Sequence, residues 1–515
     1  MASPPQSADP QQAVFKLLND PATYGGGQGN CEIRRYQTHA AVVFLAGDRA
    51  LKVKRAVRYP FLDYSSLAKR KAACEAELEI NRKFAPQLYR RVVPITREGD
   101  GSLGLDGEGT PVEWAVEMTR FDENRTLDRL AARDEINDEI VSKLAVAVAA
   151  MHAHAEPADA APWIAALEQF IRNNTSAFRK HRELFPDRAT SGLERESLSA
   201  LARLRPLLIE RGRQGLVRRG HGDLHLGNVA ILDGQPVAFD ALEFDPVIAS
   251  GDLLYDLAFL LMDLLESGRA HAANQVLNDY YTASRRVADY DGIAALPFFM
   301  SLRAAIRAMA TASRLDATKS DVASMAKRYF DLALKLMTPA KPKIVCIGGL
   351  SGTGKSLLAR ALAPSLPPAP GALVFRSDVE RKLSYGLTEN QHLPAEAYRP
   401  GISERIYRAI TEKAARVAKA GYSAIVDAVF AKSEERSSIE TAAATVGVDF
   451  CGLFLVADLK TRLDRVGTRE RDASDADTAV VLKQEEFTIG TVSWARIDAS
   501  GSSEQTLAKA RAAIK

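Results

Sequence analysis

Short apolar runs separated by polar turns occupy the first part of the chain. Residues 41–45 and 50–53 are two such runs, and the Gly47-Asp48 pair between them is typical of a turn, so we predict a β-hairpin. Residues 64–84 are charged with helical spacing and predict a helix, and residues 114–118 predict a further buried strand.

Helical spacing dominates the following two hundred residues or so. Apolar side chains recur at helical intervals over residues 136–152, over 252–265 and over long stretches between 270 and 337. The Thr-Pro-Ala-Lys-Pro segment at 338–342 ends the last of these helices. We therefore predict an α+β domain with a small sheet-bearing lobe and a large helical lobe, which is the two-lobed layout of kinases.

A different pattern begins after residue 342. Apolar strands predicted at 343–347, 373–375, 424–426 and 450–456 alternate with helical stretches. This alternation is typical of an α/β domain in which helices cover both faces of a parallel sheet. The sequence thus predicts a multidomain protein with a loose tail over residues 1–30, a first domain over 31–340 and a second over 343–515.

Length and composition agree with two domains. The 515 residues, 46% of them apolar, are too many for one hydrophobic core, and a net charge of +3 gives no global field for nucleic acid or a membrane. The most apolar run, 253–265, contains two aspartates and is too short to span a bilayer, so we predict no membrane segment. The four cysteines lack the spacing of a metal site or disulfide framework, which favours a cytoplasmic protein: Cys31, Cys74, Cys346 and Cys451.

The first chemical signature is His221-Gly-Asp-Leu-His-Leu-Gly-Asn228. Phosphoryl transfer from ATP needs a carboxylate to accept the proton of the attacking hydroxyl, ligands for Mg²⁺ and a cation at the phosphates. Asp223 fits the first task, and Asn228 and Asp240, which ends the apolar run 236–240, fit the metal. Lys52 on the predicted hairpin fits the α- and β-phosphates.

The carboxylate that would hold Lys52 should come from the helix after the hairpin. Two glutamates compete, and we favour Glu77, which shares its helical face with inward-packing apolar residues, over Glu75 on the far side. Lys54 is the alternative to Lys52, because residues two apart project from the same face of a strand.

These motifs resemble the aminoglycoside phosphotransferase and choline kinase branch of the protein-kinase-like fold. The resemblance implies ATP and Mg²⁺ as cofactors and covers about residues 40–260. One departure is the missing Gly-x-Gly-x-x-Gly over the phosphates, since the glycine-rich residues 25–29 precede the first predicted strand and the turn near Gln37 has no glycine.

The second signature, Gly349-Leu-Ser-Gly-Thr-Gly-Lys-Ser356, lies between a predicted strand and a predicted helix. Such a loop wraps nucleotide phosphates in backbone N–H groups, its lysine reaches the β/γ-phosphates and its serine hydroxyl reaches Mg²⁺. Asp427 ends the apolar run 424–427 and would order the water shell of the metal. The nucleotide-binding residues predicted here are Gly349, Ser351, Gly352, Thr353, Gly354, Lys355 and Ser356.

Acceptor chemistry favours a small kinase for this second domain. Asp378 and Arg381 follow a predicted strand, where Asp378 would deprotonate a hydroxyl and Arg381 would hold the acceptor. Arg469 and Arg471, with other arginines before them, are placed to close on the phosphates as a lid. This half resembles gluconate kinase, polynucleotide kinase and the zeta-toxin group, and the whole order resembles a family of bacterial two-domain proteins.

The leading hypothesis is an ATP- and Mg²⁺-dependent bifunctional phosphotransferase that acts on small hydroxyl-bearing molecules. The alternatives are a nucleotide-responsive regulator with one silent domain and a toxin-like P-loop kinase restrained by the N-terminal domain. Arg303 and Arg307, one helical turn apart, favour a neutral or anionic acceptor over an aminoglycoside, unless they are solvated or bind the other domain. Nucleic acid and membrane partners are not expected, and the oligomeric state is left open.

Overall fold

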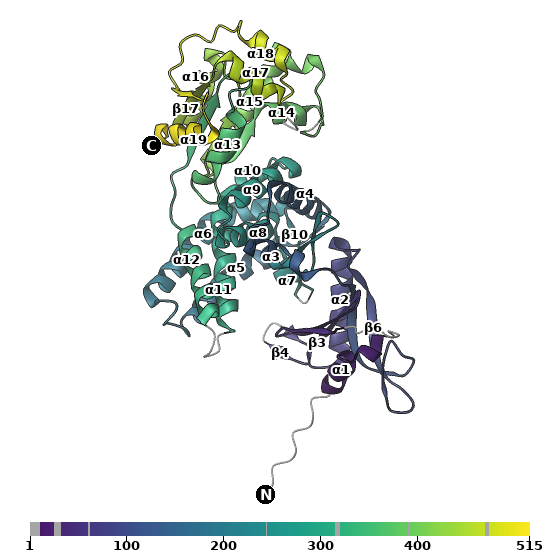
Figure 1. Cartoon of the computed structure of the whole chain (residues 1–515). Helices are drawn as coiled ribbons and strands as arrows, with labels where there is room; N and C mark the ends of the chain where they lie inside the picture. Colours follow the sequence, from purple (N-terminus) through teal and green to yellow (C-terminus); the bar gives the residue numbers. More distant parts are fainter. Residues whose placement is uncertain are drawn as a thin grey trace. The chain divides into compact units, whose positions relative to one another are not determined.

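The computed structural model describes residues 11–24, 32–59, 62–243, 245–314, 320–389, 391–468 and 473–514. The chain forms two compact units, one from residues 1–166 and 212–256, the other from 167–211 and 257–515. The α+β domain followed by an α/β domain, expected from the sequence, is confirmed (Figure 1). The domain limits 31–340 and 343–515 stay a prediction.

An antiparallel six-stranded sheet forms the small lobe of the first unit, in the order β1-β2-β3-β8-β6-β7. Lys52 pairs in register with Val43 on one side and Val116 on the other, so β3 is a central strand. Helix α2 (Leu67–Phe84), capped by Ser66, contacts β8 and β6 (Figure 1). The strands are β1 (Arg34–Gln37), β2 (Ala41–Ala46), β3 (Arg49–Lys54), β6 (Tyr89–Arg97), β7 (Leu103–Leu105) and β8 (Thr110–Thr119), with β4 (Arg58–Tyr59) and β5 (Leu62–Asp63) as a separate pair.

The expectation of a loose tail over residues 1–30 is wrong for its described part. Residues Gln11–Leu18 form helix α1, followed by a short 3-10 turn at Pro21–Tyr24. Val14, Phe15 and Leu18 are buried in one cluster with Phe44 of the sheet, because their spacing places them on one apolar face of the helix. Residues 1–10 and 25–31, including Cys31 and the glycine-rich segment, lie outside the described residues.

The rest of the first unit carries the His221–Asn228 segment. This segment connects β10 to β11, which forms a hairpin with β12, and Asp240 follows two residues after that hairpin. Helix α4, capped by Asn137, contacts β12. The elements are α3 (Leu127–Ala132), α4 (Asp138–His154), β9 (Glu156–Pro157), β10 (Val217–Arg219), β11 (Val229–Leu232), β12 (Gln235–Ala238), α7 (Pro246–Ala249) and β13 (Ser250–Asp252), with short 3-10 turns at Glu123–Arg125 and Leu226–Asn228.

Helices fill the middle of the chain, as predicted from the apolar spacing. Phe178, Phe185 and Phe330 pack ring against ring, with centroids 4.7 to 5.0 Å apart. The helices are α5 (Ala160–Phe178), α6 (Asp187–Arg213), α8 (Leu253–Glu266), α9 (Ala270–Ser284), α10 (Asp289–Gly292), α11 (Leu296–Ala312) and α12 (Ser320–Leu336), with a 3-10 turn at Ile293–Ala295. Among the described residues one stretch, Asp289–Ala312, could cross a membrane by length and composition alone, and 67% of its apolar window is buried in the protein, as in a core helix.

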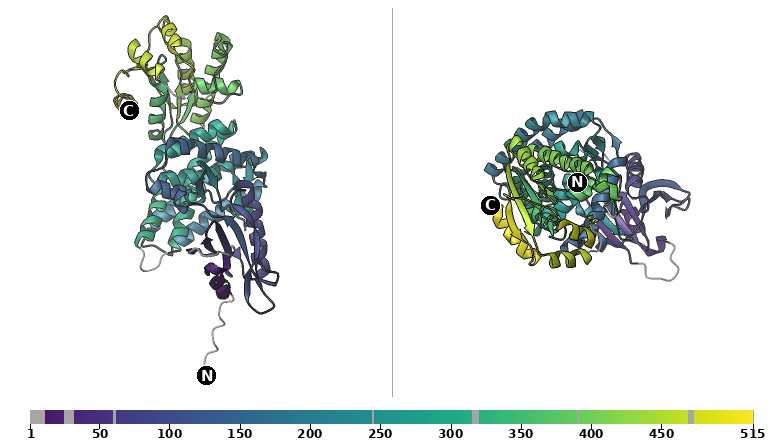
Figure 2. Two further views of the ribbon diagram at one scale, coloured as in Figure 1. Left: turned by 45° about the vertical axis from the view of Figure 1, so that its right-hand side comes forward. Right: turned by 90° about the horizontal axis from the view of Figure 1, so that it is seen from above.

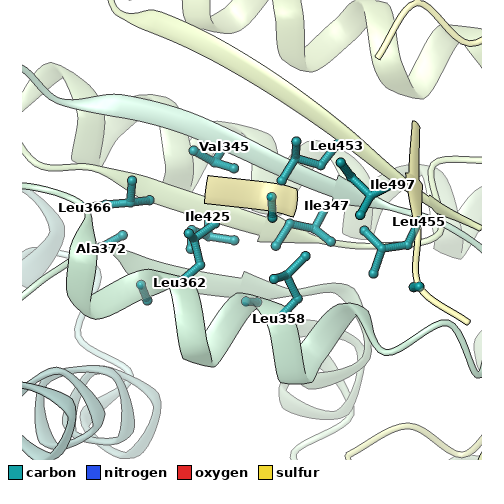
Figure 3. Close-up of a cluster of buried hydrophobic side chains, with 14 residues drawn as sticks. Val345, Ile347, Leu358, Leu362, Leu366, Ala372, Ile425, Leu453, Leu455 and Ile497 are labelled. Carbon is teal, nitrogen blue, oxygen red and sulfur yellow. The ribbon is translucent and has the colours of Figure 1, made fainter. Parts of the chain in front are cut away.

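A five-stranded parallel sheet, ordered β15-β16-β14-β17-β18, forms the centre of the C-terminal domain. Val345 and Ile347 pack with Leu358 and Leu362 of α13 in the buried cluster of Figure 3, to which α19 adds Ala510. Ile344 and Cys346, which alternate with them, are equally buried on the opposite face, and helices flank the sheet in both views of Figure 2. The strands are β14 (Lys343–Gly348), β15 (Leu373–Arg376), β16 (Ala424–Asp427), β17 (Asp449–Val456) and β18 (Ala495–Asp498).

The helices of this domain follow the strands in alternation. They are α13 (Lys355–Leu362), α14 (Ser377–Ser384), α15 (Pro400–Lys419), α16 (Ser433–Val446), α17 (Leu459–Gly467), α18 (Thr478–Gln484) and α19 (Ser503–Ala513), with 3-10 turns at Ala363–Ser365 and Ala395–Tyr398.

Helix α9 lies along β15 at the end of this sheet. The Asn278 side chain donates to the Ala372 carbonyl at 3.2 Å and accepts from the Val374 N–H at 2.7 Å. Asn274, one turn earlier, donates to the same Ala372 carbonyl at 3.0 Å. The two amides therefore bond to main-chain groups of β15 as a neighbouring strand would.

Candidate functional sites

Two lysines and three carboxylates meet beneath the small-lobe sheet. Lys52 Nζ lies 2.8 Å from Glu77 Oε1 and also contacts Asp240. Lys54 Nζ lies 2.6 Å from Glu77 Oε2 and also contacts Glu243. The two lysines face the same way because they stand two residues apart on β3. The structure thus brings three predicted site residues together with Lys54, the alternative to Lys52, and it adds Glu243 to them.

Glu77 is charged although it is fully buried. Burial favours its neutral form, but the ammonium groups of Lys52 and Lys54 outweigh burial and hold the pKa of Glu77 at about 2. Burial likewise acts to lower the pKa of Lys52, and the carboxylates of Asp240 and Glu77 overcome it and raise that pKa well above its ordinary value. Glu75 instead lies on the exposed side of α2, with Lys71 at 3.6 Å.

Asp256 anchors the segment that begins at His221. Its two carboxylate oxygens accept the N–H groups of His221 at 2.9 Å and Gly222 at 3.0 Å, and His152 Nε2 lies 3.2 Å from it. Asp252 accepts the Leu254 N–H at 2.9 Å and so caps α8. These contacts give both aspartates structural roles.

Asp223 and Asn228 lie on the same loop and contact each other. Asn228 Nδ2 donates to the Asp223 carbonyl at 3.0 Å and to its carboxylate at 3.1 Å. His225 Nδ1 accepts the Gly227 N–H at 3.1 Å, which fixes the loop, and its Nε2 is 3.5 Å from the Asp223 carboxylate. With its amide nitrogen committed to Asp223, Asn228 has its Oδ1 as the atom that suits a metal.

Asp240 has a backbone conformation that few residues other than glycine adopt. Its φ is +61°, in the left-handed region. Two side chains hold this turn: the Asp240 N–H donates to the Tyr89 hydroxyl at 3.0 Å, and the Ala241 N–H donates to Asn81 Oδ1 at 2.8 Å. Sequence reasoning missed Tyr89 and Asn81, although Asn81 stands one helical turn after Glu77. Such strain is tolerated where it aims a functional side chain.

A cavity of about 440 Å³ joins these groups. Lys52, Asp223 and Asp240 line it, together with apolar side chains of β2 and β3. The cavity is of the size that small ligands occupy, and its polar lining, cationic side chains together with carboxylates, suits ATP phosphates with Mg²⁺. The turn between β1 and β2 has no glycine, and its Thr38 and His39 carbonyls accept bonds of 3.0 and 3.1 Å from Arg55.

The glycine-rich loop between β14 and α13 requires its glycines. Gly349, Gly352 and Gly354 have φ values of +135°, +85° and +90°. A Cβ atom at Gly349 would lie 2.5 Å from the Leu455 carbonyl oxygen, and one at Gly352 would lie 2.6 Å from that of Arg462. The loop therefore forms a tight cradle that other residues would not fit, directly before the N-terminus of α13.

Ser356, Asp427 and Arg376 form a second polar cluster next to this loop. Ser356 Oγ donates to Asp427 Oδ2 at 2.6 Å, and Arg376 donates to Ser356 Oγ at 3.0 Å. Lys355 Nζ lies 3.2 Å from the Leu350 carbonyl of the loop. A hydroxyl beside a carboxylate suits Mg²⁺, which takes few protein ligands when phosphates complete its shell. No group of three or more His, Cys, Asp or Glu side chains with metal-site geometry occurs within the described ranges.

Gln484 and Arg462 hold the loop from the opposite side. The Ser351 N–H donates to Gln484 Oε1 at 2.7 Å, and Arg462 Nε donates to the Ser351 carbonyl at 2.9 Å. Thr353 Oγ1 donates to the Leu350 carbonyl at 2.8 Å, so its hydroxyl shapes the loop. The sequence offered no signal for Gln484, which ends the short helix α18 more than a hundred residues away.

A cavity of about 670 Å³ opens beside the loop and contains Lys355, Ser356 and Asp378. Burial, the largest influence, raises the pKa of Asp378 above its ordinary value, although Arg376 opposes it. Arg381 also lines the cavity, but it is buried, donates to the Ala397 carbonyl at 2.6 Å and stacks on the Tyr398 ring at 4.9 Å. Asp378 thus lies with the phosphate-loop residues, and Arg381 supports the wall.

The structure places Arg303 in the helical core and Arg307, which is half-buried, one turn later on the same helix. Arg303 is buried with its guanidinium 4.8 Å from the Phe259 ring centre, and that of Arg307 is 5.7 Å from the Tyr329 ring centre. Tyr329 in turn donates to Asp263 at 2.6 Å. These contacts stabilise helix packing, and an acceptor-binding role for the two arginines stays a prediction. Arg469 and Arg471 lie outside the described residues.

Both signatures fall within matched family models. Residues 41–296 match the model of the phosphotransferase enzyme family, and residues 344–488 match a model described as AAA domain. This chain joins a domain matched by the phosphotransferase enzyme family model to a P-loop domain matched by the AAA domain model. Uncharacterized proteins of Mycobacterium tuberculosis (strain H37Rv) and Mycobacterium bovis are each 27% identical to it over 492 residues, covering 92% of this chain and 94% of the relative.

Solved structures resemble each half of the chain in turn. For the phosphotransferase-family domain, a choline/ethanolamine kinase family protein from Mesorhizobium loti is 15% identical and covers 64% of this chain and 96% of its own, with a TM-score of 0.36. For the P-loop domain, a gluconokinase from Sinorhizobium meliloti 1021 is 20% identical and covers 34% of this chain and 96% of its own, with a TM-score of 0.24.

Proposed function

We propose that this protein is a bifunctional phosphotransferase that uses ATP and Mg²⁺ at two separate sites to phosphorylate small hydroxyl-bearing molecules. The observation that carries the proposal is that each site has a phosphate-binding lysine, a metal-binding side chain and a candidate base in one cavity. In the first, Lys52, Asp223 and Asp240 face a common space, and in the second Lys355, Ser356 and Asp378 do so.

At the first site, Glu77 holds Lys52 in place, and Lys52 binds the α- and β-phosphates. Asn228 and Asp240 would hold Mg²⁺, which supplies charge neutralisation at the phosphates. Asp223 accepts the proton of the acceptor hydroxyl as that oxygen bonds to the γ-phosphorus and the bond to ADP breaks. Asn228 orients Asp223 through the 3.1 Å bond to its carboxylate.

At the second site the loop N–H groups and Lys355 bind the phosphates, while Ser356 and Asp427 would hold Mg²⁺. Asp378 is the base. Its raised pKa makes it a stronger proton acceptor than an ordinary aspartate once it is ionised. Arg381 stacks on Tyr398 and so fixes the part of the cavity wall against which the acceptor would bind. Arg469 and Arg471 are proposed to close over the nucleotide.

The acceptors are proposed to be neutral or anionic metabolites of a reducing cytoplasm. Free thiols at Cys74, Cys346 and Cys451 suit that compartment. A second candidate function, a regulator whose first domain binds ATP without transfer, is favoured by one observation. The turn over the first cavity is Thr38-His39-Ala40 instead of glycine, and Arg55 holds it.

The deciding experiment incubates the full chain with Mg²⁺, ATP labelled in the γ-phosphate and a cell-derived pool of small molecules, and follows labelled products by mass spectrometry. Lys52→Met and Lys355→Met each silence one site. Bifunctionality requires two product sets, each lost in one variant only. Products that vanish only with Lys355→Met would establish the regulatory alternative, and growth arrest on expression of Lys52→Met alone would indicate a restrained toxin-like kinase. Absence of any labelled product would contradict the proposal.

A further inference from the structure

A second cavity in the first unit lies behind the small-lobe helix and away from Lys52. Its volume is about 400 Å³, close to that of the nucleotide cavity. Three segments form its walls: the C-terminal half of α2, the helix α4, and the hairpin of β11 and β12. None of the phosphotransfer residues assigned above lines it.

The interior of this rear cavity is apolar, whereas one rim is charged. Ile80 and Phe84 of α2, Leu144 and Met151 of α4 and Val237 of β12 provide the apolar surface. The rim carries the cations Lys83 and Arg219 and a single anion, Glu156.

The charges at the rim do not cancel. Lys83 Nζ is 2.7 Å from Glu156 Oε1, so this pair is neutral. Arg219 is a second cation acting on the same Glu156, and its Nε atom is buried without a hydrogen-bond partner. A buried guanidinium nitrogen with no acceptor is costly and is the feature that an anionic group from outside would relieve. His154, also at the rim, is bonded through Nδ1 to the Ala150 carbonyl at 2.8 Å.

The walls of the rear cavity lead directly to the phosphotransfer residues. Ile80 stands one turn after Glu77 on α2. Ala238 precedes Asp240 by two residues. Gly220 adjoins His221, whose ring packs 5.9 Å from that of Phe84. A molecule that fills this space therefore contacts α2, which carries Glu77, the residue before His221 and the hairpin that precedes Asp240.

We propose that the rear cavity is an effector site for an organic monoanion with an apolar body, whose anionic group binds Arg219 and whose binding favours the pairing of Glu77 with Lys52. The volume admits roughly a dozen non-hydrogen atoms, at about 30 Å³ for each water-sized group. A medium-chain carboxylate or a small aromatic carboxylate has this size and charge. Because the effector binds the arrangement that also binds nucleotide, each ligand raises the affinity for the other by the same factor.

Calorimetric titration of the full chain with octanoate tests the site. We expect saturable binding, about fifteen-fold weaker binding of hexanoate, which lacks two CH2 groups, and no comparable binding of the neutral 1-octanol. Arg219→Met should weaken octanoate at least tenfold, and Ala147→Trp, which fills the cavity from α4, should abolish binding. Thermal unfolding verifies that each variant is folded.

The matched control is Lys71→Met, because Lys71 lies on α2 like Lys83 and also pairs with one glutamate, yet it is remote from the cavity rim. Lys71→Met should leave octanoate affinity within twofold of the parent. Equal losses in Lys71→Met and Arg219→Met, equal binding of 1-octanol, or unchanged binding in folded Ala147→Trp would overturn the site.

Coupling is measured with a non-hydrolysable ATP analogue in the Lys355→Met chain, in which only the first site takes nucleotide. Saturating octanoate should raise the affinity for the analogue, and saturating analogue should raise that for octanoate equally. Binding of octanoate with no change in analogue affinity would overturn the effector role. These are binding measurements, so their outcome is independent of whether either site transfers phosphate.

Discussion

The Ser356 hydroxyl donates a 2.6 Å hydrogen bond to the Asp427 carboxylate, across the end of the phosphate loop. The two residues are 71 positions apart, and they meet because β14 and β16 are adjacent parallel strands whose carboxyl ends share one edge. Ligands of open α/β sheets bind at this edge.

Replacement of Asp427 by asparagine should therefore weaken Mg²⁺-dependent nucleotide binding at the P-loop site. Loss of one charge-assisted contact costs about 1.5–3 kcal/mol, or roughly ten- to a hundred-and-fifty-fold in affinity. Titration of an ATP analogue with and without Mg²⁺ measures the effect. Asp449→Asn, at the exposed start of the neighbouring strand β17, is the control and should change nothing.

At the first site, Asp223→Asn and Asp240→Asn should have different effects. Asp223→Asn should keep ATP binding and slow transfer by about 10²- to 10⁴-fold, since it removes a proton acceptor. Asp240→Asn should reduce the Mg²⁺-dependent affinity for ATP, because it removes a metal-ligand charge. Equal losses of affinity in the two variants during Mg²⁺ titration would refute the assignment of their roles.

Glu77→Gln should destabilise the first unit by about 3–5 kcal/mol, because it leaves two buried lysines short of a countercharge. Denaturant unfolding measures this. The pKa of Glu77 is lowered on folding from 4.5 to about 2, so its stabilising contribution is full above pH 4.5 and is lost as the pH falls toward 2. The stability of Glu77→Gln should not show this decrease between pH 4.5 and 2. Glu75→Gln, on the exposed side of the same helix, should stay within about 0.5 kcal/mol of the parent.

Asp378→Asn should lower transfer at the P-loop site about 10²- to 10⁴-fold and yet raise its thermal unfolding midpoint at neutral pH. Folding raises the pKa of Asp378, so the folded state gains stability from its neutral form at low pH and loses it as the pH rises through the raised pKa. Asparagine is neutral throughout. Because this base acts only when it is ionised, the transfer rate of the parent protein should fall on acidification at a higher pH than it would with an ordinary aspartate. A lower unfolding midpoint in the variant would contradict this account.

The sequence predicted the two folds and most of their strands because apolar periodicity is local. The strands at 41–46, 49–54 and 343–348 and the helices at 67–84, 138–154 and 253–266 occur close to where the pattern placed them. The parallel sheet followed from the alternation of strands and helices. Helix α1 was missed because it is only eight residues long and follows a polar, proline-rich start, so its short apolar face is recognised only from its packing against the sheet.

Site residues that depend on contacts with residues far away in the sequence were harder to predict. The preference for Glu77 over Glu75 rested on one helical face, and the structure places Glu77 beside Lys52. Tyr89, Asn81 and Gln484 carry no motif, since each bonds to a partner far along the chain. The spacing of Arg303 and Arg307 indicated a charged helical face, but periodicity does not reveal that both guanidinium groups pack on aromatic rings.

The bonds from Asn274 and Asn278 to β15 have a consequence for dividing this protein. A fragment cut at residues 338–342 would leave the Ala372 carbonyl and the Val374 N–H without α9, and an open strand edge of this kind recruits strands from other molecules. Fragment 343–515 should therefore self-associate, whereas one that retains α9 should not, as sedimentation would show. The linker at 338–342 separates the two sequence patterns, but a fragment whose β15 edge stays covered has to begin earlier, at α9.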